Sequence, residues 1–177
     1  YPFGFKEIWG LAYRTDYDLK KHTESSGEDL TIQDDEEKVT PHVIEPAVGL
    51  NRLMLTVLCD AYVQEGERVI LKLNPKLAPY KVAVFPLLAN KPDLVQKAKE
   101  IFDDLSKENS LLPVAWDSRG NIGKRYFSQD EIGTPFCITV DFDTLTDDSV
   151  TLRDRDTAKQ ERIKISTLAK IISSRLN

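Results

Sequence analysis

The stretch "IEPAVGLNRLMLTVL", residues 44–58, places an arginine where the backbone disfavours a positive charge. From Leu50 onward the apolar residues recur at the i, i+3, i+4, i+7 spacing of one buried helical stripe, namely Leu50, Leu53, Met54, Val57, Leu58, Ala61 and Tyr62. Gly49 opens this predicted helix, so Arg52 lies near its N-terminus. Because free N–H groups and the helix dipole carry partial positive charge there, a cation costs a few tenths to about 1 kcal/mol.

A phosphate would turn this unfavourable position of Arg52 into a useful one. An anion at a helix N-terminus receives hydrogen bonds from the backbone N–H groups, and the guanidinium would add a planar fork of donors. The alternative is that Arg52 projects into water and binds nothing. The residues alone leave both interpretations open.

Composition limits the classes of protein to consider. The chain has 177 residues, 41% of them hydrophobic, which is enough for one or two packed domains. No apolar run approaches the roughly 18 residues of a membrane span, and the N-terminus lacks the features of a signal peptide. We therefore expect a cytoplasmic protein with no membrane partner. Cys59, Cys137, His22 and His42 lack zinc-site spacing, so we expect two buried, reduced thiols and no structural zinc.

The net charge of −5 is unevenly distributed. Residues 1–74 carry 8 Lys and Arg against 14 Asp and Glu, a net charge of −6, whereas residues 75–177 carry 16 against 15, a net charge of +1. A polyanionic partner would therefore meet the C-terminal part of the chain. The alternative is that these cations form an ordinary solvated surface.

The N-terminal part of the chain contains few elements. We expect strands at 5–14 and 41–48, with a polar surface excursion at 20–39 that includes a short hairpin, and then the helix that begins at Leu50. Two strands and one helix cannot enclose a core. This part must therefore lean on the rest of the chain or belong to something larger.

The C-terminal part alternates between strands and helices. We expect strands at 80–88, 111–117, 135–141, 149–156 and 161–165, and helices at 91–109, 121–133 and 166–176, the last capped by Ser166. This alternation predicts an α/β domain with a mixed, mainly parallel five-stranded sheet and three helices. The predicted organisation is a first domain at 1–64, a linker at 65–79 and a second domain at 80–177.

Two motifs lie in the N-terminal part of the chain. "EIWGLAYRTDYDLKKH" has the pattern Glu-x-x-Gly-x-Ala-x-Arg-x-x-Tyr-Asp-Leu, and "IEPAVGLNR" has the pattern Ile-Glu-Pro-x-x-Gly-x-x-Arg. They resemble the class II glycyl-tRNA synthetases of the dimeric type, in which the second pattern is the third class-defining motif. "APYKVAVFPL", "RGNIGKRYFSQDEIGTPFCITVD" and "VTLRDRDTAKQERI" resemble the anticodon-binding domain shared by the glycyl, histidyl, threonyl and prolyl enzymes. The resemblance implies a remnant of the antiparallel catalytic domain followed by an anticodon-binding domain.

The resemblance also implies roles in the first domain. Arg52 and Glu7 would be catalytic, with Glu7 meeting Mg²⁺ through ATP. ATP would be bound by Glu7, Ile8, Gly49, Leu50, Asn51 and Arg52. Glycine would be bound by Glu45, Pro46, Ala47, Val48 and Gly49. The family usually has a serine that helps to read glycine where this chain has Ala47.

For the second domain the resemblance implies binding to the anticodon of tRNA(Gly). Unstacked bases are held by aromatic or guanidinium stacking and by edge hydrogen bonds, while Lys and Arg contact phosphates. The candidate residues are Arg119, Lys124, Arg125, Tyr126, Phe127, Arg153 and Arg155.

The implied activity is that of a glycine–tRNA ligase, which activates glycine with ATP and transfers it to tRNA(Gly). We expect the first two class-defining motifs to lie upstream of Tyr1, so this chain would be a C-terminal fragment, inactive alone and monomeric, of a homodimeric enzyme. The alternative is a non-catalytic nucleic-acid-binding protein of synthetase-like architecture.

Overall fold

The chain forms two compact units, Tyr1–Cys59 and Asp60–Asn177, each of which is considered by itself. The computed structural model describes residues 4–108 and 113–176. Among these residues, no helix is long and apolar enough to cross a membrane. The predicted helix at 91–109 and the predicted strand at 111–117 each extend partly outside the described residues.

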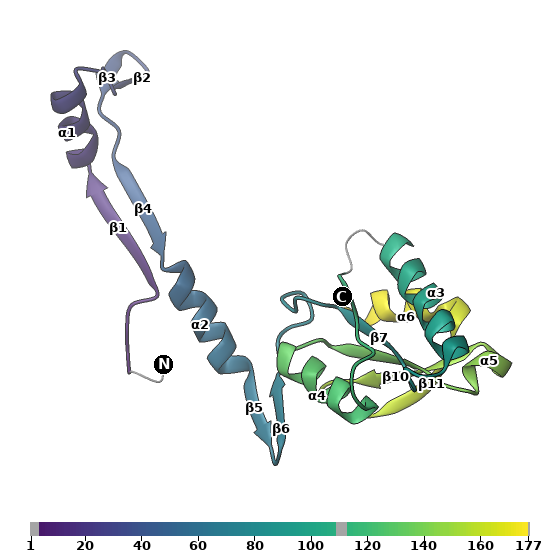
Figure 1. Cartoon of the computed structure of the whole chain (residues 1–177). Coiled ribbons are helices and arrows are strands. Elements are labelled where there is room, and N and C mark those ends of the chain that lie inside the picture. The colour runs from purple at the N-terminus through teal and green to yellow at the C-terminus, as the bar shows by residue number, and fades with distance from the viewer. Residues whose placement is uncertain (1–3, 109–112, 177) are drawn as a thin grey trace. The chain divides into compact units, whose positions relative to one another are not determined.

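The first unit is built on a two-stranded ribbon (Figure 1). Strands β1 (Trp9–Thr15) and β4 (Val43–Val48) pair antiparallel, and helix α2 (Leu50–Ala61) begins directly after β4. These three elements confirm the predicted ones. Helix α1 (Tyr17–Ser26) and the hairpin of β2 (Ile32–Asp34) and β3 (Glu37–Val39) lie between the two strands. The prediction had the hairpin but missed α1, because all of its side chains are polar or only partly covered and it lacks an apolar stripe.

The first unit has no core of its own. No side chain from Gly4 to Asp60 is buried. The apolar stripe of α2, predicted to be buried, is largely open: Leu50 is 73% exposed and Met54 is 63% exposed. A ribbon and two helices do not provide a second apolar layer against which the stripe can pack.

The second unit contains a mixed five-stranded sheet, as predicted. The strands are β7 (Val82–Pro86), β8 (Val114–Trp116), β9 (Phe136–Val140), β10 (Ser149–Asp154) and β11 (Gln160–Lys164). Their order is β11-β10-β9-β7-β8. β7 pairs parallel with β8 and β9, while β10 pairs antiparallel with β9 and β11. Parallel and antiparallel pairings are therefore equal in number, so the sheet is not mainly parallel.

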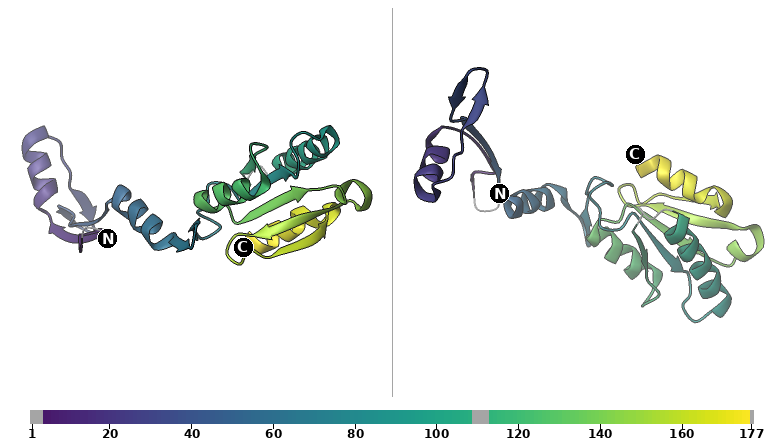
Figure 2. Two further views of the ribbon diagram at one scale, coloured as in Figure 1. Left: turned by 60° about the horizontal axis from the view of Figure 1, so that its bottom comes forward. Right: turned by 90° about the horizontal axis from the view of Figure 1, so that it is seen from above.

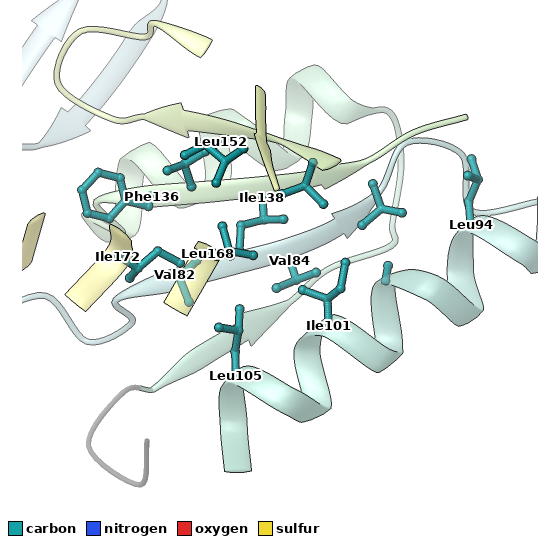
Figure 3. Close-up of a cluster of buried hydrophobic side chains, with 14 residues drawn as sticks. Val82, Val84, Leu94, Ile101, Leu105, Phe136, Ile138, Leu152, Leu168 and Ile172 are labelled. Carbon is teal, nitrogen blue, oxygen red and sulfur yellow. The ribbon is translucent and has the colours of Figure 1, made fainter. Parts of the chain in front are cut away.

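Helices pack on this sheet and bury its two faces (Figure 2). On one face, α3 (Pro92–Glu108) and α6 (Ile165–Leu176) enclose the main core, whose labelled members in Figure 3 are Val82, Val84, Leu94, Ile101, Leu105, Phe136, Ile138, Leu152, Leu168 and Ile172. On the other face, α4 (Ile122–Ile132) covers a smaller cluster of Ala83, Phe85, Ala115 and Cys137. The alternation of apolar residues along the strands thus supplies both faces.

Residues 65–79, predicted as a linker, belong to the second unit. Strands β5 (Tyr62–Glu65) and β6 (Arg68–Leu71) form an antiparallel hairpin, and β6 packs on α4. Gly133, which ends α4 with φ +87°, lies so close to this segment that an added Cβ would be 3.0 Å from the carbonyl oxygen of Leu71. The units divide at Cys59, upstream of the predicted boundary.

One helix boundary differs from the prediction, and one short helix was not predicted. Helix α6 begins at Ile165, so Ser166 lies inside it and is not its cap. A short helix, α5 (Thr144–Asp147), follows β9 and was not predicted. It is one turn long, which is too short to produce apolar periodicity.

The environments of the two cysteines predict different thiol reactivities. Cys137 is buried in the sheet, and burial raises the pKa of its thiol to about 12, whereas Cys59 is exposed and so departs from the predicted pair of buried thiols. Because the thiolate is the reactive form, Cys137 should resist an aromatic disulfide reagent at pH 8. We expect one reactive thiol in the native chain and two in denaturant. Reaction of Cys137 in the native chain, shown by a Cys59→Ser variant, would contradict the packing of β9.

Candidate functional site

The ribbon of the first unit has two chemically distinct faces. Side chains alternate along each strand, and directly paired residues point to the same side. One face carries large apolar residues through the pairs Trp9–Val48, Leu11–Pro46 and Tyr13–Ile44. The opposite face carries small residues and a carboxylate through the pairs Gly10–Ala47 and Ala12–Glu45.

The small face is suited to a small cationic group. Gly10, Ala12 and Ala47 leave room above the strands, and Glu45 supplies a negative charge beside them. Glu45 is balanced by Arg14, whose Nε lies 3.3 Å from a Glu45 carboxylate oxygen. Arg14 also donates to Asp18, and these two carboxylates raise the pKa of its guanidinium. The site prediction omitted Arg14, although the quoted family pattern contains it.

The structure brings together the predicted ATP-binding residues at the end of the ribbon. The N–H of Gly49 donates to the carbonyl of Ile8 at 3.0 Å, and Nη1 of Arg52 donates to the carbonyl of Glu7 at 2.8 Å. Arg52 occupies the third position of α2, whose first turn has no acidic residue. Leu50 and Asn51 are exposed in the same turn.

The register separates the predicted glycine-binding residues. Glu45 and Ala47 lie on the small face, whereas the side chains of Pro46 and Val48 lie on the apolar face. Pro46 and Val48 therefore do not line the small face with their side chains. Within the described residues, no group of three or more His, Cys, Asp or Glu could hold a metal ion.

In the second unit, Arg125 is buried and does not face solvent. It donates to the carbonyls of Pro86, Ser118, Arg119 and Gly120, the last at 2.9 Å. Because a buried guanidinium must be hydrogen-bonded, these acceptors account for its position inside the domain. The predicted RNA contact by Arg125 is therefore wrong.

Arg153 is also buried, against a fully buried carboxylate. Its two terminal nitrogens lie 2.9 and 3.0 Å from the oxygens of Asp130, and Arg68 Nε lies 2.7 Å from the same carboxylate. The guanidinium also lies over the ring of Tyr126, 4.8 Å from its centroid. The structure therefore assigns Arg153 to the interior and contradicts its predicted contact with RNA.

Arg155 completes this set of internal arginines. It donates to the carbonyls of Gly133 at 2.7 Å and Leu73 at 2.9 Å, and it is buried. It thus fastens the segment after β6 to the end of α4. Tyr126 is half-buried: its hydroxyl bonds to Thr139 at 2.6 Å, and its ring meets Phe85 edge-on. The predicted RNA contact by Arg155 is incompatible with its burial, whereas the contact predicted for the partly exposed Tyr126 stays a prediction.

Three predicted RNA-binding residues are exposed at α4. Arg119 precedes the helix, Lys124 lies in its first turn, and Phe127 follows one turn later with 44% of its area exposed. The turn before α4 is well defined, because the Asn121 side chain accepts from the N–H of Lys124 at 2.9 Å. An ammonium group, a guanidinium and an aromatic ring thus lie close together in sequence, in α4 and the loop before it.

The edge strand β11 carries two exposed cations that were not among the predicted RNA-binding residues. Thr139, Thr151 and Arg162 are paired in register across β9, β10 and β11, on the face covered by α4. Arg162 and Lys164 are exposed at the edge strand, and Arg162 is balanced by Asp141 at 2.6 Å. The alternation of "ERIKI" around the buried Ile163 was the signal that could have revealed them.

The buried carboxylate Asp130 predicts a large effect on stability. In Asp130→Asn, Arg68 and Arg153 would remain buried without their counter-charge, so we expect a loss of about 3–5 kcal/mol in the free energy of unfolding. Asp156→Asn, which alters a half-exposed partner of Arg155, should cost no more than about 1 kcal/mol. Urea unfolding followed by Trp116 fluorescence measures both. Equal effects would contradict the interior role of Asp130.

Comparison with known proteins is consistent with this geometry. The chain is 50% identical over 183 residues to the glycine--tRNA ligase of Clostridium beijerinckii and 52% identical over 182 residues to that of Caldanaerobacter subterraneus subsp. tengcongensis. It is 48% identical over 184 residues to that of Staphylococcus haemolyticus. Each alignment covers 99% of this chain and 38% of the relative, so the chain spans about two-fifths of the length of these curated relatives.

The second unit also matches a defined domain family. The profile of the anticodon binding domain covers residues 81–175, which include all five strands of the mixed sheet and helices α3, α4 and α6. This match accounts for more than half of the chain. The chain therefore belongs to the anticodon binding domain family.

Proposed function

We propose that this chain is part of a class II glycine–tRNA ligase, to which it contributes the third class-defining motif and the anticodon-binding domain. The observation that carries the proposal is the identity of 48–52% to proteins named glycine--tRNA ligase, which extends over both units. The activity itself is ATP-dependent activation of glycine and its transfer to tRNA(Gly).

In this proposal the small face of the ribbon receives glycine. Glu45 would pair with the substrate ammonium in competition with Arg14, and Gly10 and Ala47 would leave space for an amino acid without a side chain. A small pocket excludes larger amino acids sterically, which is the form of discrimination that a tiny substrate allows. Ala47 offers no hydroxyl, so charge and shape would carry the selection.

The end of the ribbon would hold ATP. Arg52 would neutralise the triphosphate, and Gly49 would let the nucleotide approach the backbone without a side chain in the way. Bound Mg²⁺ would be held by Glu7 and the phosphate oxygens and would supply charge neutralisation. The hydrogen bond from Arg52 to the Glu7 carbonyl supports this proposal, because it holds the two residues next to each other at the end of the ribbon.

The second unit would recognise the anticodon through the exposed surface of α4. Arg119, Lys124 and Phe127 are exposed there, unlike the three predicted arginines that are buried. We further propose that this chain does not aminoacylate by itself and that the complete enzyme is a cytoplasmic homodimer.

The role of Arg52 can be tested in the full-length synthetase. Arg52→Ala should reduce glycine-dependent ATP–pyrophosphate exchange by about a hundredfold to a thousandfold, because a charge-assisted contact with the transition state is lost. Arg52→Lys should recover only part of the activity, since a point charge cannot reproduce the planar fork. The melting temperature should change little, because removing a cation from a helix N-terminus offsets the lost hydrogen bond to Glu7.

Lys38→Ala provides the control, since it removes an exposed cation of the first unit whose ion pair, among the described residues, is with the exposed Asp29. Its exchange activity should equal that of the unaltered enzyme. If Arg52→Ala kept its exchange activity but melted at a clearly lower temperature, the role of Arg52 would be to stabilise the backbone at Glu7 and not to bind phosphate.

A further inference from the structure

The loop that precedes α4 holds Arg119 in one orientation. Nε and Nη2 of Arg119 lie 3.1 and 3.2 Å from the two carboxylate oxygens of Asp117, and the backbone N–H of Arg119 donates to the same carboxylate at 2.9 Å. Asp117 is buried, yet 89% of the Arg119 side chain is exposed. The guanidinium is therefore held along one edge, and its flat faces remain open.

The backbone of this loop is held in place by hydrogen bonds from Arg125. Its guanidinium donates hydrogen bonds to the carbonyls of Ser118, Arg119 and Gly120. Gly120 takes a left-handed conformation, φ +59°, which a residue with a side chain adopts only with strain. The loop therefore does not need to be ordered by a ligand, which reduces the entropic cost of binding at Arg119.

The ion pair also decides what Arg119 can bind. Bidentate capture of a phosphate uses two parallel N–H groups of one guanidinium edge; Asp117 occupies the Nε–Nη2 edge, which leaves the Nη1–Nη2 edge as the one remaining edge for such a contact. The buried carboxylate also offsets the positive charge that would attract a phosphate. Stacking of an unpaired base needs only a flat exposed face and tolerates the ion pair.

We propose that Arg119 binds an unpaired RNA base by stacking on its guanidinium plane and does not bind a phosphate. This inference rests on the proposed function, because it takes anticodon-loop RNA as the ligand. Lys124, exposed on the next turn and without an ion pair among the described residues, is the phosphate-binding counterpart.

Salt dependence separates the two kinds of contact. Affinity of the 177-residue chain for the anticodon stem–loop of tRNA(Gly) would be measured by fluorescence anisotropy over a series of salt concentrations. Arg119→Ala should weaken binding about 5- to 150-fold without changing the slope of log affinity against log salt. Lys124→Ala should instead reduce the magnitude of that slope by about 0.7, the value for one phosphate of a single strand.

Two further variants test the stacking face directly. Arg119→Tyr keeps a flat face without the charge and should bind within a few-fold of the unaltered chain, whereas Arg119→Lys keeps the charge and should bind as weakly as Arg119→Ala. Because this side chain is almost fully exposed, we expect all these variants to fold, and their melting curves check this.

The opposite pattern would overturn the inference. Rescue by Arg119→Lys, together with a reduced salt slope in Arg119→Ala, would make Arg119 a phosphate ligand. Unchanged affinity in Arg119→Ala would remove Arg119 from the interface while leaving the proposed function standing. If the unaltered chain gave no saturable binding, the proposed function would fail, and this inference with it.

Discussion

The arrangement of the second unit depends on one buried carboxylate. Asp130 lies at the end of α4 and accepts hydrogen bonds from Arg153 on β10 and Arg68 on β6. A buried carboxylate with two guanidinium partners is stable only when all three groups are in place, so it fixes the helix, the sheet and the hairpin together. The exposed residues at the start of α4 take their positions from this arrangement.

The first unit shows what happens to a sequence that lacks such an interior. Its ribbon places small residues and Glu45 on one face and large apolar residues on the other, with no buried side chain from Gly4 to Asp60. The chemistry proposed for the ribbon needs few side chains: the β1–β4 register places Glu45 on the small face, and a hydrogen bond at the end of the ribbon joins Arg52 to the Glu7 carbonyl.

Periodic patterns in the sequence predicted most of the helices and strands. They did not predict which polar side chains would be buried. The alternation of strands and helices and the stripe after Leu50 follow from short-range periodicity, so they could be found in the sequence. Arginines that bind RNA and arginines that bind Asp130 look alike in a sequence, because the partner of Arg153 lies 23 residues away in the chain. The segment 65–79, which contains β6, was predicted to be a linker for a similar reason: its contacts with the domain come from Arg68 and Arg155, whose partners are distant in the sequence.

The central claim is that the second unit recognises the anticodon of tRNA(Gly). Its most direct test compares the affinity of this chain for the tRNA(Gly) anticodon stem–loop with that for the same stem–loop carrying replaced anticodon bases, at one salt concentration. Charge and length are identical in the two RNAs, so any difference reports contacts to bases. We expect a preference of at least about fivefold for the glycine anticodon, the lower end of what one base contact supplies. Equal affinity for the two RNAs would contradict it.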